Sequence, residues 1–461
     1  MEGRKKLLRY SYIYACALLI LVVWLFSFMK NNDVIHYHFD IESLGLTILG
    51  LVSMLILIFI EDSFFFGVLL LMTPFAFARE FDISNMPLTF FLVVALALIG
   101  LILHLFIYKT KIKKGTYFIS LLLFCIGTLF GGLINSSAFL TSFLASFAIS
   151  VLIMLVYMFL VSYLDNHSFN EICHIMLALG IILILQTGLY QYIMHKDAMF
   201  LAKDAKYGWG CTNNLALMLL FTFPFGIFLT MKSKNVFSLF ASIVVVIEAI
   251  TIMLNYSRGA TFIMFVMLPI CIIYAFIKSK DKLWFALYYV ITIFIAFIIF
   301  VVIASLNREL FDAIWANVFN FNFDTLNGRK NVYIFMLEES KNHLFFGKGI
   351  LSTLNMEIYR PIDETMLDNY SWGHNSFIHV LFTCGLFGLT CFLGHLYTKY
   401  KVLLKDANEK KMTILFGFLV SGFYGLMDIS YYYIIYMVVL IVIMALVESY
   451  ICKEPSEESE M

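Results

Sequence analysis

Long uncharged runs of Leu, Ile, Phe and Val recur along the whole chain and constrain its fold more than any other feature. A helix that crosses the hydrocarbon core of a bilayer needs about 20 consecutive apolar residues. Segments that reach or approach this length number fourteen and lie near 11–29, 41–60, 63–78, 88–108, 116–134, 138–164, 171–193, 212–231, 235–254, 259–277, 283–305, 374–397, 412–428 and 431–450. Because a bilayer offers no water to unpaired backbone groups, these segments are expected to cross it as helices. We therefore predict an all-α, polytopic integral membrane protein with about 14 transmembrane helices.

Composition supports lipid as the main solvent and excludes several kinds of site. The chain is 62% hydrophobic and 13% charged, whereas soluble proteins carry about 25% charged residues. Lys+Arg and Asp+Glu balance at 31 each, which indicates no nucleic-acid partner. The eight cysteines have no ligand-like spacing, so we expect neither a disulfide framework nor a metal site. His36 and His38 could touch a metal, but such a pair is more often part of a polar loop. We expect no cofactor.

Short basic loops indicate which side of the membrane each end faces. The basic N-terminus precedes an apolar run without a small-x-small cleavage site, so we interpret that run as an uncleaved first span. Lysine-rich loops at 108–115, 232–235, 278–282 and 399–411 fall on the same side as the N-terminus if all fourteen spans are real. Such loops stay cytoplasmic. The prediction is a multi-pass protein of the inner or plasma membrane with both termini in the cytoplasm.

The alternation of the fourteen predicted spans across the membrane places one large hydrophilic loop on the extracytoplasmic side. We divide the chain into transmembrane helices 1–11 (1–305), an extracytoplasmic loop (306–373), helices 12–14 (374–450) and a cytoplasmic tail (451–461). Within the loop, "NVYIFMLEESKNHLFFGKGI" has helical periodicity, which predicts a small cap of short helices. The stretch 191–214 and the turn at 255–259 also fall outside.

Arg258 lies in the short turn "NYSRG" between two apolar runs. A charged side chain near the bilayer centre costs about 2.5–3.5 kcal/mol on insertion scales, so it is retained for a partner. It could snorkel to the outer headgroups. Alternatively it could bind an anion, with Gly259 allowing close approach and the next helix N-terminus adding partial positive charge.

Further polar residues of the outer side admit a structural and a functional interpretation. Arg329 and Lys330 could be a solvated face, and His374 could be a satisfied helix cap. The loop acids nearest His374 are Asp363, Glu364 and Asp368, which could be solvated or could orient it. Glu248, inside the apolar run "IVVVIEAITIML", could pair with an Arg or face a polar cavity.

Four stretches, in order, carry a resemblance to a known family: "YGWGCTNNLALMLLFTFP" (207–224), "YSRGATFI" (256–263), "NGRKNVYIFMLEESKNHLFFGKGI" (327–350) and "GHNSFIHVLFTCGLFGL" (373–389). These stretches resemble motifs of the O-antigen ligase and Wzy-type polymerase superfamily of membrane glycosyltransferases. In order, the motifs are a glycine–asparagine turn, a serine–arginine–glycine turn, a Gly-Arg helix that closes with G-x-G, and a span that begins with His-Asn. The resemblance covers 207–389 and implies a GT-C-like fold.

The resemblance also implies a reaction and its residues. The donor would be an undecaprenyl-pyrophosphate-linked oligosaccharide, transferred to an acceptor hydroxyl on the outer face of the membrane. Guanidinium groups bind phosphate bidentately, so Arg258 and Arg329 are candidates to hold the diphosphate. His374 could be the general base or a phosphate ligand. Candidate substrate-binding residues are Asn375, Lys330, Gly259, Asn213 and Asn214. Arg258, Arg329 and His374 are expected to converge.

The function then has three alternatives. The divergent subfamily motifs and the Phe-, Ile- and Lys-rich composition favour a polysaccharide polymerase of the O-antigen, capsule or exopolysaccharide type. A ligase would instead hand the glycan to a lipid or protein acceptor. A flippase or transporter is disfavoured because the chain has six prolines and no evident internal repeat. Expected partners are membrane lipids, a chain-length regulator and a flippase.

Overall fold

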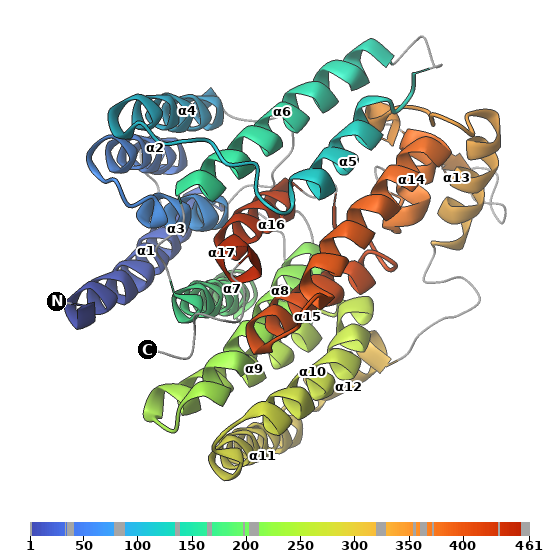
Figure 1. Ribbon diagram of the computed structural model, residues 1–461. Coiled ribbons are helices and arrows are strands. Elements are labelled where there is room, and N and C mark those ends of the chain that lie inside the picture. Colours follow the sequence, from blue (N-terminus) through green and yellow to red (C-terminus); the bar gives the residue numbers. More distant parts are fainter. Residues whose placement is uncertain are drawn as a thin grey trace. The chain divides into compact units, whose positions relative to one another are not determined.

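A computed structural model gives the fold of the chain (Figure 1). It describes residues 2–32, 34, 41–77, 88–133, 139–163, 168–196, 199–201, 212–319, 329–353, 356–359, 367–370, 373–431 and 434–452. The backbone forms two compact units, which are considered separately. Unit 1 comprises 1–112, 159–319 and 416–420, and unit 2 comprises 113–158, 320–415 and 421–461.

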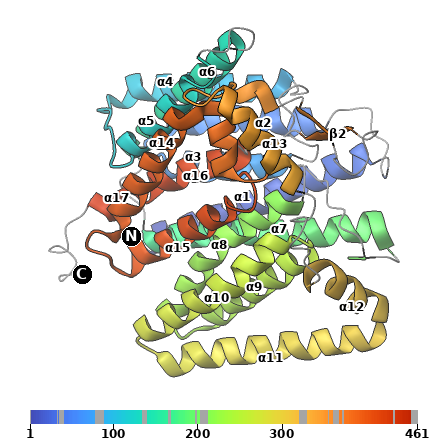
Figure 2. The same cartoon turned by 90° about the vertical axis from the view of Figure 1, so that its right-hand side faces the viewer.

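Unit 1 is built from apolar helices that pack on one another. Its elements are α1 (Glu2–Asn31), α2 (Ile41–Phe59), α3 (Phe64–Met72), the 3-10 turn η1 (Thr73–Ala76), α4 (Leu88–Tyr108), α7 (Phe169–His195), α8 (Thr212–Lys232), α9 (Val236–Leu254), α10 (Arg258–Lys278), α11 (Lys282–Leu306), α12 (Arg308–Ile314) and the π-helical turn η4 (Trp315–Phe319). Helix α6 (Phe139–Tyr163) passes from unit 2 into unit 1. Helix α9 packs against α8, α10 packs mainly against α8, and α11 packs mainly against α9 (Figure 2).

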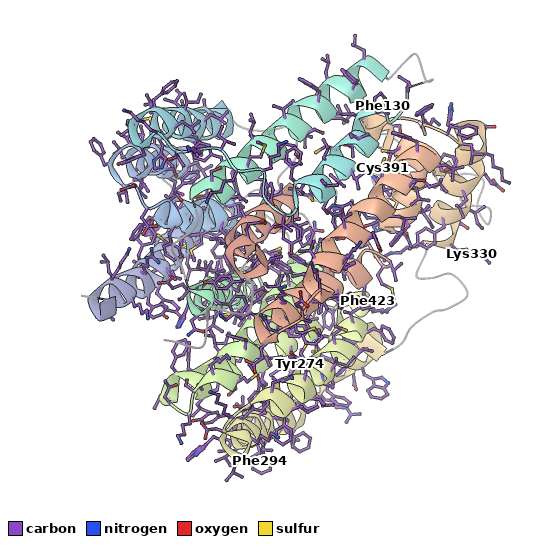
Figure 3. All side chains as sticks on the ribbon, in the orientation of Figure 1. Phe130, Tyr274, Phe294, Lys330, Cys391 and Phe423 are labelled. Carbon is purple, nitrogen blue, oxygen red and sulfur yellow. The ribbon has the colours of Figure 1, made fainter. Side chains whose placement is uncertain are left out.

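The helices of unit 1 range from fully enclosed to mostly uncovered. Almost every residue of α8 is buried, which suits a helix that is apolar on all faces. In contrast, α11 exposes large apolar side chains such as Val290, Phe294 (Figure 3) and Phe297. An uncovered surface of this kind is expected to face lipid acyl chains.

Glu248 illustrates how a polar group is accommodated in this bundle. Its carboxylate is buried and accepts a hydrogen bond of 2.7 Å from the Thr222 hydroxyl. Gly180 of α7 leaves the room for it, because a Cβ at that position would lie 1.8 Å from Glu248 Oε1. The hydrogen-bond partner of Glu248 is thus a hydroxyl on α8, and not the arginine that was one of the predicted alternatives.

Unit 2 holds helix α13 of the segment 306–373 and the last spans. Its elements are α5 (Phe118–Leu129), most of α6, α13 (Lys330–Asn342), the 3-10 turn η5 (Ile350–Thr353), strands β1 (Met356–Tyr359) and β2 (Leu367–Tyr370), α14 (Ser376–Leu404), both ends of α15 (Glu409–Tyr424), α16 (Ile434–Leu446) and α17 (Glu448–Cys452). The strands pair antiparallel, with Met356 opposite Tyr370. Helix α13 packs on α14 (Figure 1).

Helix α14 is interrupted at Gly385. This glycine has φ 69° and ψ −167°, which separates a short first part, 376–384, from a longer second part, 386–404. The rings of Phe377 and Phe392 lie 5.5 Å apart. In a straight helix, residues fifteen positions apart would be separated by about 22 Å along the axis. The two parts of α14 therefore bend toward each other.

The structure confirms the predicted all-α, polytopic class. Each of the fourteen predicted spans coincides with a helix, and eight helices of the described residues are long and apolar enough to cross a membrane. The predicted short helices of the outer loop are present as α12 and α13. Two details differ: the loop also contains the β1–β2 hairpin, and the span predicted at 374–397 is a broken helix that ends at Leu404.

Candidate active site

Three charged or titratable side chains meet in unit 2. His374 directly precedes the cap of α14, Arg329 directly precedes α13, and Asp428 lies in the turn between α15 and α16. Asp428 contacts both of the others through different oxygens. His374 Nδ1 lies 3.3 Å from Oδ1, and Arg329 Nη2 lies 3.5 Å from Oδ2. One carboxylate therefore bridges an imidazole and a guanidinium, and two of the three predicted catalytic residues share a site.

Local hydrogen bonds fix the turn 425–431 against the start of α14. The Ser376 amide donates to the Gly425 carbonyl at 2.7 Å, and its hydroxyl donates to the Asp428 carbonyl at 3.1 Å. The Ser430 amide donates back to that hydroxyl at 3.2 Å. These bonds hold the backbone on both sides of the Asp428 carboxylate.

Asn375 joins the same two segments. Its Oδ1 caps α14 by accepting from the amides of Phe377 at 2.9 Å and Ile378 at 3.1 Å. Its Nδ2 donates to the Leu426 carbonyl at 3.0 Å. Asn at an N-cap satisfies amides that have no partner within the helix. The structure thus gives this predicted substrate-binding residue a capping contact.

Helix α13 holds Arg329 and the backbone of His374. Arg329 Nη1 donates to the Met427 carbonyl. One turn into the helix, the Tyr333 hydroxyl donates to the His374 carbonyl at 2.8 Å. His374 has φ 46°, a left-handed conformation that is uncommon for a residue with a side chain. The Tyr333 contact therefore stabilises the backbone that directs the imidazole toward Asp428.

Burial and charge differ among the three groups. The Asp428 side chain is 8% exposed, against 27% for His374 and 26% for Arg329. Burial acts to raise the pKa of Asp428. The hydrogen bond and charge of His374, the charge of Arg329 and the Ile429 amide outweigh burial, so this pKa lies below its ordinary value. Asp428 is therefore ionised at neutral pH beneath two basic groups that remain partly accessible.

The far end of α13 is clamped into the break of α14. The amides of Lys348 and Gly349 donate to the carbonyls of Phe382 and Thr383, both at 2.9 Å. In return, the amides of Leu386 and Phe387 donate to the carbonyls of Leu344 and Phe345 at 2.8 and 3.0 Å. The segment 344–349, which includes the G-x-G turn, thus satisfies backbone groups that the break at Gly385 leaves without helical partners.

Side chains reinforce this clamp. Lys348 Nζ lies 2.9 Å from Glu339 Oε2 and 5.8 Å above the Phe382 ring. Val332, Met336 and Phe382 form a small buried cluster between the two helices. Helix α13 is thus joined to α14 and the residues that precede it near both of its ends, at Tyr333 and at the segment 344–349.

A second polar cluster lies in unit 1, where two helices begin next to each other. The Ser257 hydroxyl donates to Asn213 Oδ1 at 2.9 Å. Asn213 is the second residue of α8, and Ser257 precedes Arg258 and Gly259, the first residues of α10. Arg258 Nη2 donates to the Ala316 carbonyl at 3.4 Å. Two helix N-termini, each with partial positive charge, accompany this guanidinium.

The remaining predicted residues are placed as follows. Lys330 is exposed at the start of α13 (Figure 3), and Asn214 is partly buried on α8. Asp363 and Glu364 lie outside the described residues, and Asp368 belongs to β2. The predicted convergence of Arg258 with Arg329 and His374 stays a prediction, because Arg258 belongs to the other unit.

Sequence reasoning missed Asp428, the acid beside His374. A signal was present, because Asp428 is an isolated acid in "FYGLMDISYYY" between two apolar segments. The predicted parity puts this turn outside, as it does His374. Like Arg258, an acid at the end of a span is expected to be retained for an interaction with a partner.

A comparison with protein-family models gives a match to part of the chain. The family model described as O-Antigen ligase matches residues 243–393. This segment contains Arg258, Arg329 and His374 and ends before Asp428. No curated protein sequence matches the chain.

Proposed function

Because residues 243–393 belong to the O-antigen ligase family, we propose that this membrane protein is a polysaccharide polymerase. It transfers a glycan from undecaprenyl pyrophosphate to the acceptor sugar of another lipid-linked repeat unit. The reaction takes place on the outer face of the cell's inner or plasma membrane, and both termini are cytoplasmic. The observation that carries the proposal is the Asp428 carboxylate held between His374 and Arg329.

The imidazole suits the role of general base. Asp428 faces Nδ1 of His374 at 3.3 Å, which leaves Nε2 as the nitrogen that takes the proton. A buried carboxylate in this position stabilises the imidazolium that forms and fixes its tautomer. The acceptor oxygen forms a bond to the anomeric carbon, and its proton passes to Nε2. The bond from the anomeric carbon to the pyrophosphate oxygen breaks at the same time, with inversion.

The guanidinium groups are suited to stabilise the negative charge of the leaving diphosphate. Arg329 is partly exposed and oriented by Asp428 and the Met427 carbonyl. A preorganised donor lowers the barrier most where negative charge develops, and here that charge develops on the polyprenyl diphosphate. Arg258, with Gly259, Asn213 and Asn214 near it in unit 1, is proposed as a second phosphate ligand. Lys330 adds a positive charge next to Arg329.

The test combines genetics and chemistry. A deletion strain complemented with wild-type chain is expected to make long polymer, and one complemented with His374→Gln only single repeat units. Purified protein with lipid-linked oligosaccharide is expected to form new glycosidic bonds. Absence of bond formation by the wild-type protein, with normal substrate translocation, would contradict the proposal and favour a flippase.

A ligase is the second candidate, because the matching family model carries that description. A ligase would transfer the finished glycan to a lipid or protein acceptor with the same catalytic groups. Deletion separates the two functions. A ligase mutant accumulates full-length polymer on the carrier lipid, whereas a polymerase mutant accumulates single units.

A further inference from the structure

Lys399 is a fully buried lysine that the proposed reaction does not use. It lies in the second part of α14, and its exposed fraction is 0%. Transfer of an ammonium group out of water is strongly unfavourable, even after the protein relaxes around it. A lysine this close to the end of α14 at Leu404 could extend to the headgroups instead. Its burial therefore indicates an interior contact that compensates for the loss of hydration.

The interior contact is with tyrosine. Lys399 Nζ donates a hydrogen bond to the Tyr431 hydroxyl. The same ammonium group lies 4.9 Å from the ring centroids of both Tyr431 and Tyr400. Cation–π contacts are strongest where water is excluded. The Tyr431 ring also packs on Phe392 and His395 of α14, at 5.1 and 5.6 Å, so it is held on several sides.

Tyr431 ends the turn 425–431 that carries Asp428. On the side of α15, the Asp428 amide donates to the Tyr424 carbonyl at 2.9 Å. Next to the carboxylate, Ser376 bonds both the Asp428 carbonyl and the Ser430 amide. On the far side, the Lys399 ammonium group donates a hydrogen bond to the Tyr431 hydroxyl.

We propose that Lys399 and Tyr431 form a buried anchor that sets the position of the Asp428 carboxylate and, through it, of the His374 imidazole. Both are positioning residues, remote from the reacting atoms. The inference rests on the proposed function, because it assigns the anchor to the same His374 site. It accounts for a lysine that is directed into the protein and away from the membrane surface.

The test uses two side-chain removals with matched controls in full-length protein reconstituted in lipid nanodiscs. Lys399→Met removes the charge and keeps the length, so no buried charge is left uncompensated. Tyr431→Phe removes only the hydroxyl. The controls are Lys401→Met and Tyr397→Phe, because both of these side chains are exposed on the same helix. They are expected to leave activity unchanged.

The expected result has three parts. Lys399→Met and Tyr431→Phe each lower kcat roughly 10- to 100-fold, the range expected for a misplaced catalytic group, while KM is unchanged. The double variant is no slower than either single variant. Hydrogen exchange at the amides of Ile429 and Ser430 becomes faster.

The contrary outcomes are distinct. Wild-type kcat in both variants, with or without a lower Tm, overturns the positioning role if His374→Gln is inactive in the same assay. Unchanged exchange at 429 and 430 overturns the anchor itself. Full activity of His374→Gln overturns the proposed function instead, and the exchange experiment still decides whether the anchor exists.

Discussion

The Asp428 carboxylate lies 3.3 Å from Nδ1 of His374, although 54 residues separate the two in sequence. The same carboxylate contacts the Arg329 guanidinium at 3.5 Å through its other oxygen. The proposed general base and the proposed phosphate ligand thus contact the same buried carboxylate. The site can be tested through each of these three groups and through the backbone that brings them together.

Replacement of His374 by Gln removes the proposed general base and retains a polar side chain of similar size. We expect the rate of glycosidic bond formation to fall roughly 100- to 10,000-fold, the usual contribution of general base catalysis. The measurement is product formed from lipid-linked oligosaccharide per amount of folded protein. A rate equal to that of the wild type would remove His374 from the mechanism.

Arg329 and Lys330 form a matched pair of neighbouring cations. Arg329→Ala is expected to lower kcat/KM roughly 10- to 150-fold, because a hydrogen bond to a charged group contributes about 1.5–3 kcal/mol. Lys330→Ala, on an exposed residue, is expected to have a much smaller effect. Equal losses in both variants would indicate a general effect of positive charge and would argue against a specific phosphate ligand.

Arg308, a second arginine of unit 1, provides a control for the replacement of Arg258. Arg258→Ala is expected to lower kcat/KM, whereas Arg308→Ala is expected to leave it unchanged, since Arg308 is 78% exposed and pairs with Asp312. Combination of Arg258→Ala with Arg329→Ala tests whether both guanidiniums act on one diphosphate. Coupled losses are expected, because groups that bind one ligand together are non-additive. Full activity of Arg258→Ala leaves snorkelling as its role.

The lowered pKa of Asp428 predicts how stability depends on pH. Since the folded pKa lies below the unfolded value, the carboxylate stabilises the fold above the ordinary Asp pKa of about 3.9. That stabilisation is lost as the pH falls through the folded pKa. We expect wild type to exceed Asp428→Asn in Tm at neutral pH and the difference to narrow on acidification below pH 4. A difference that is constant or widens toward low pH contradicts this assignment.

Gly385 and Gly394 lie on the same helix but differ in their surroundings. A Cβ at Gly385 would lie 2.4 Å from the Phe345 carbonyl carbon, and the residue has φ 69°. Gly385→Ala should cost at least about 1–3 kcal/mol for backbone strain and lower the yield of folded protein. At Gly394 a Cβ would meet only the end of the Leu123 side chain, at 3.1 Å. Gly394→Ala should therefore fold with much smaller loss, as measured by size-exclusion chromatography in detergent.

The sequence by itself determined the class of the protein and the positions of its helices. Apolar runs can be recognised without tertiary contacts, because a bilayer requires both their length and their helical conformation. Short motifs also indicated Arg329 and His374 as candidate site residues, and they resembled the family whose model matches residues 243–393. These signals are local, so they are readable from neighbouring residues.

Tertiary structure alone decided which acid contacts His374 and how the helix break at Gly385 is stabilised. Asp363 and Glu364 are near His374 in sequence, but the chain turns between α15 and α16 to place Asp428 against it. The break at Gly385 is stabilised by backbone atoms of 344–349, and Lys399 is buried because Tyr431 lies against it. Each of these relationships joins segments far apart in the chain. Their free energy depends on packing and hydrogen-bond geometry, which residue order does not specify.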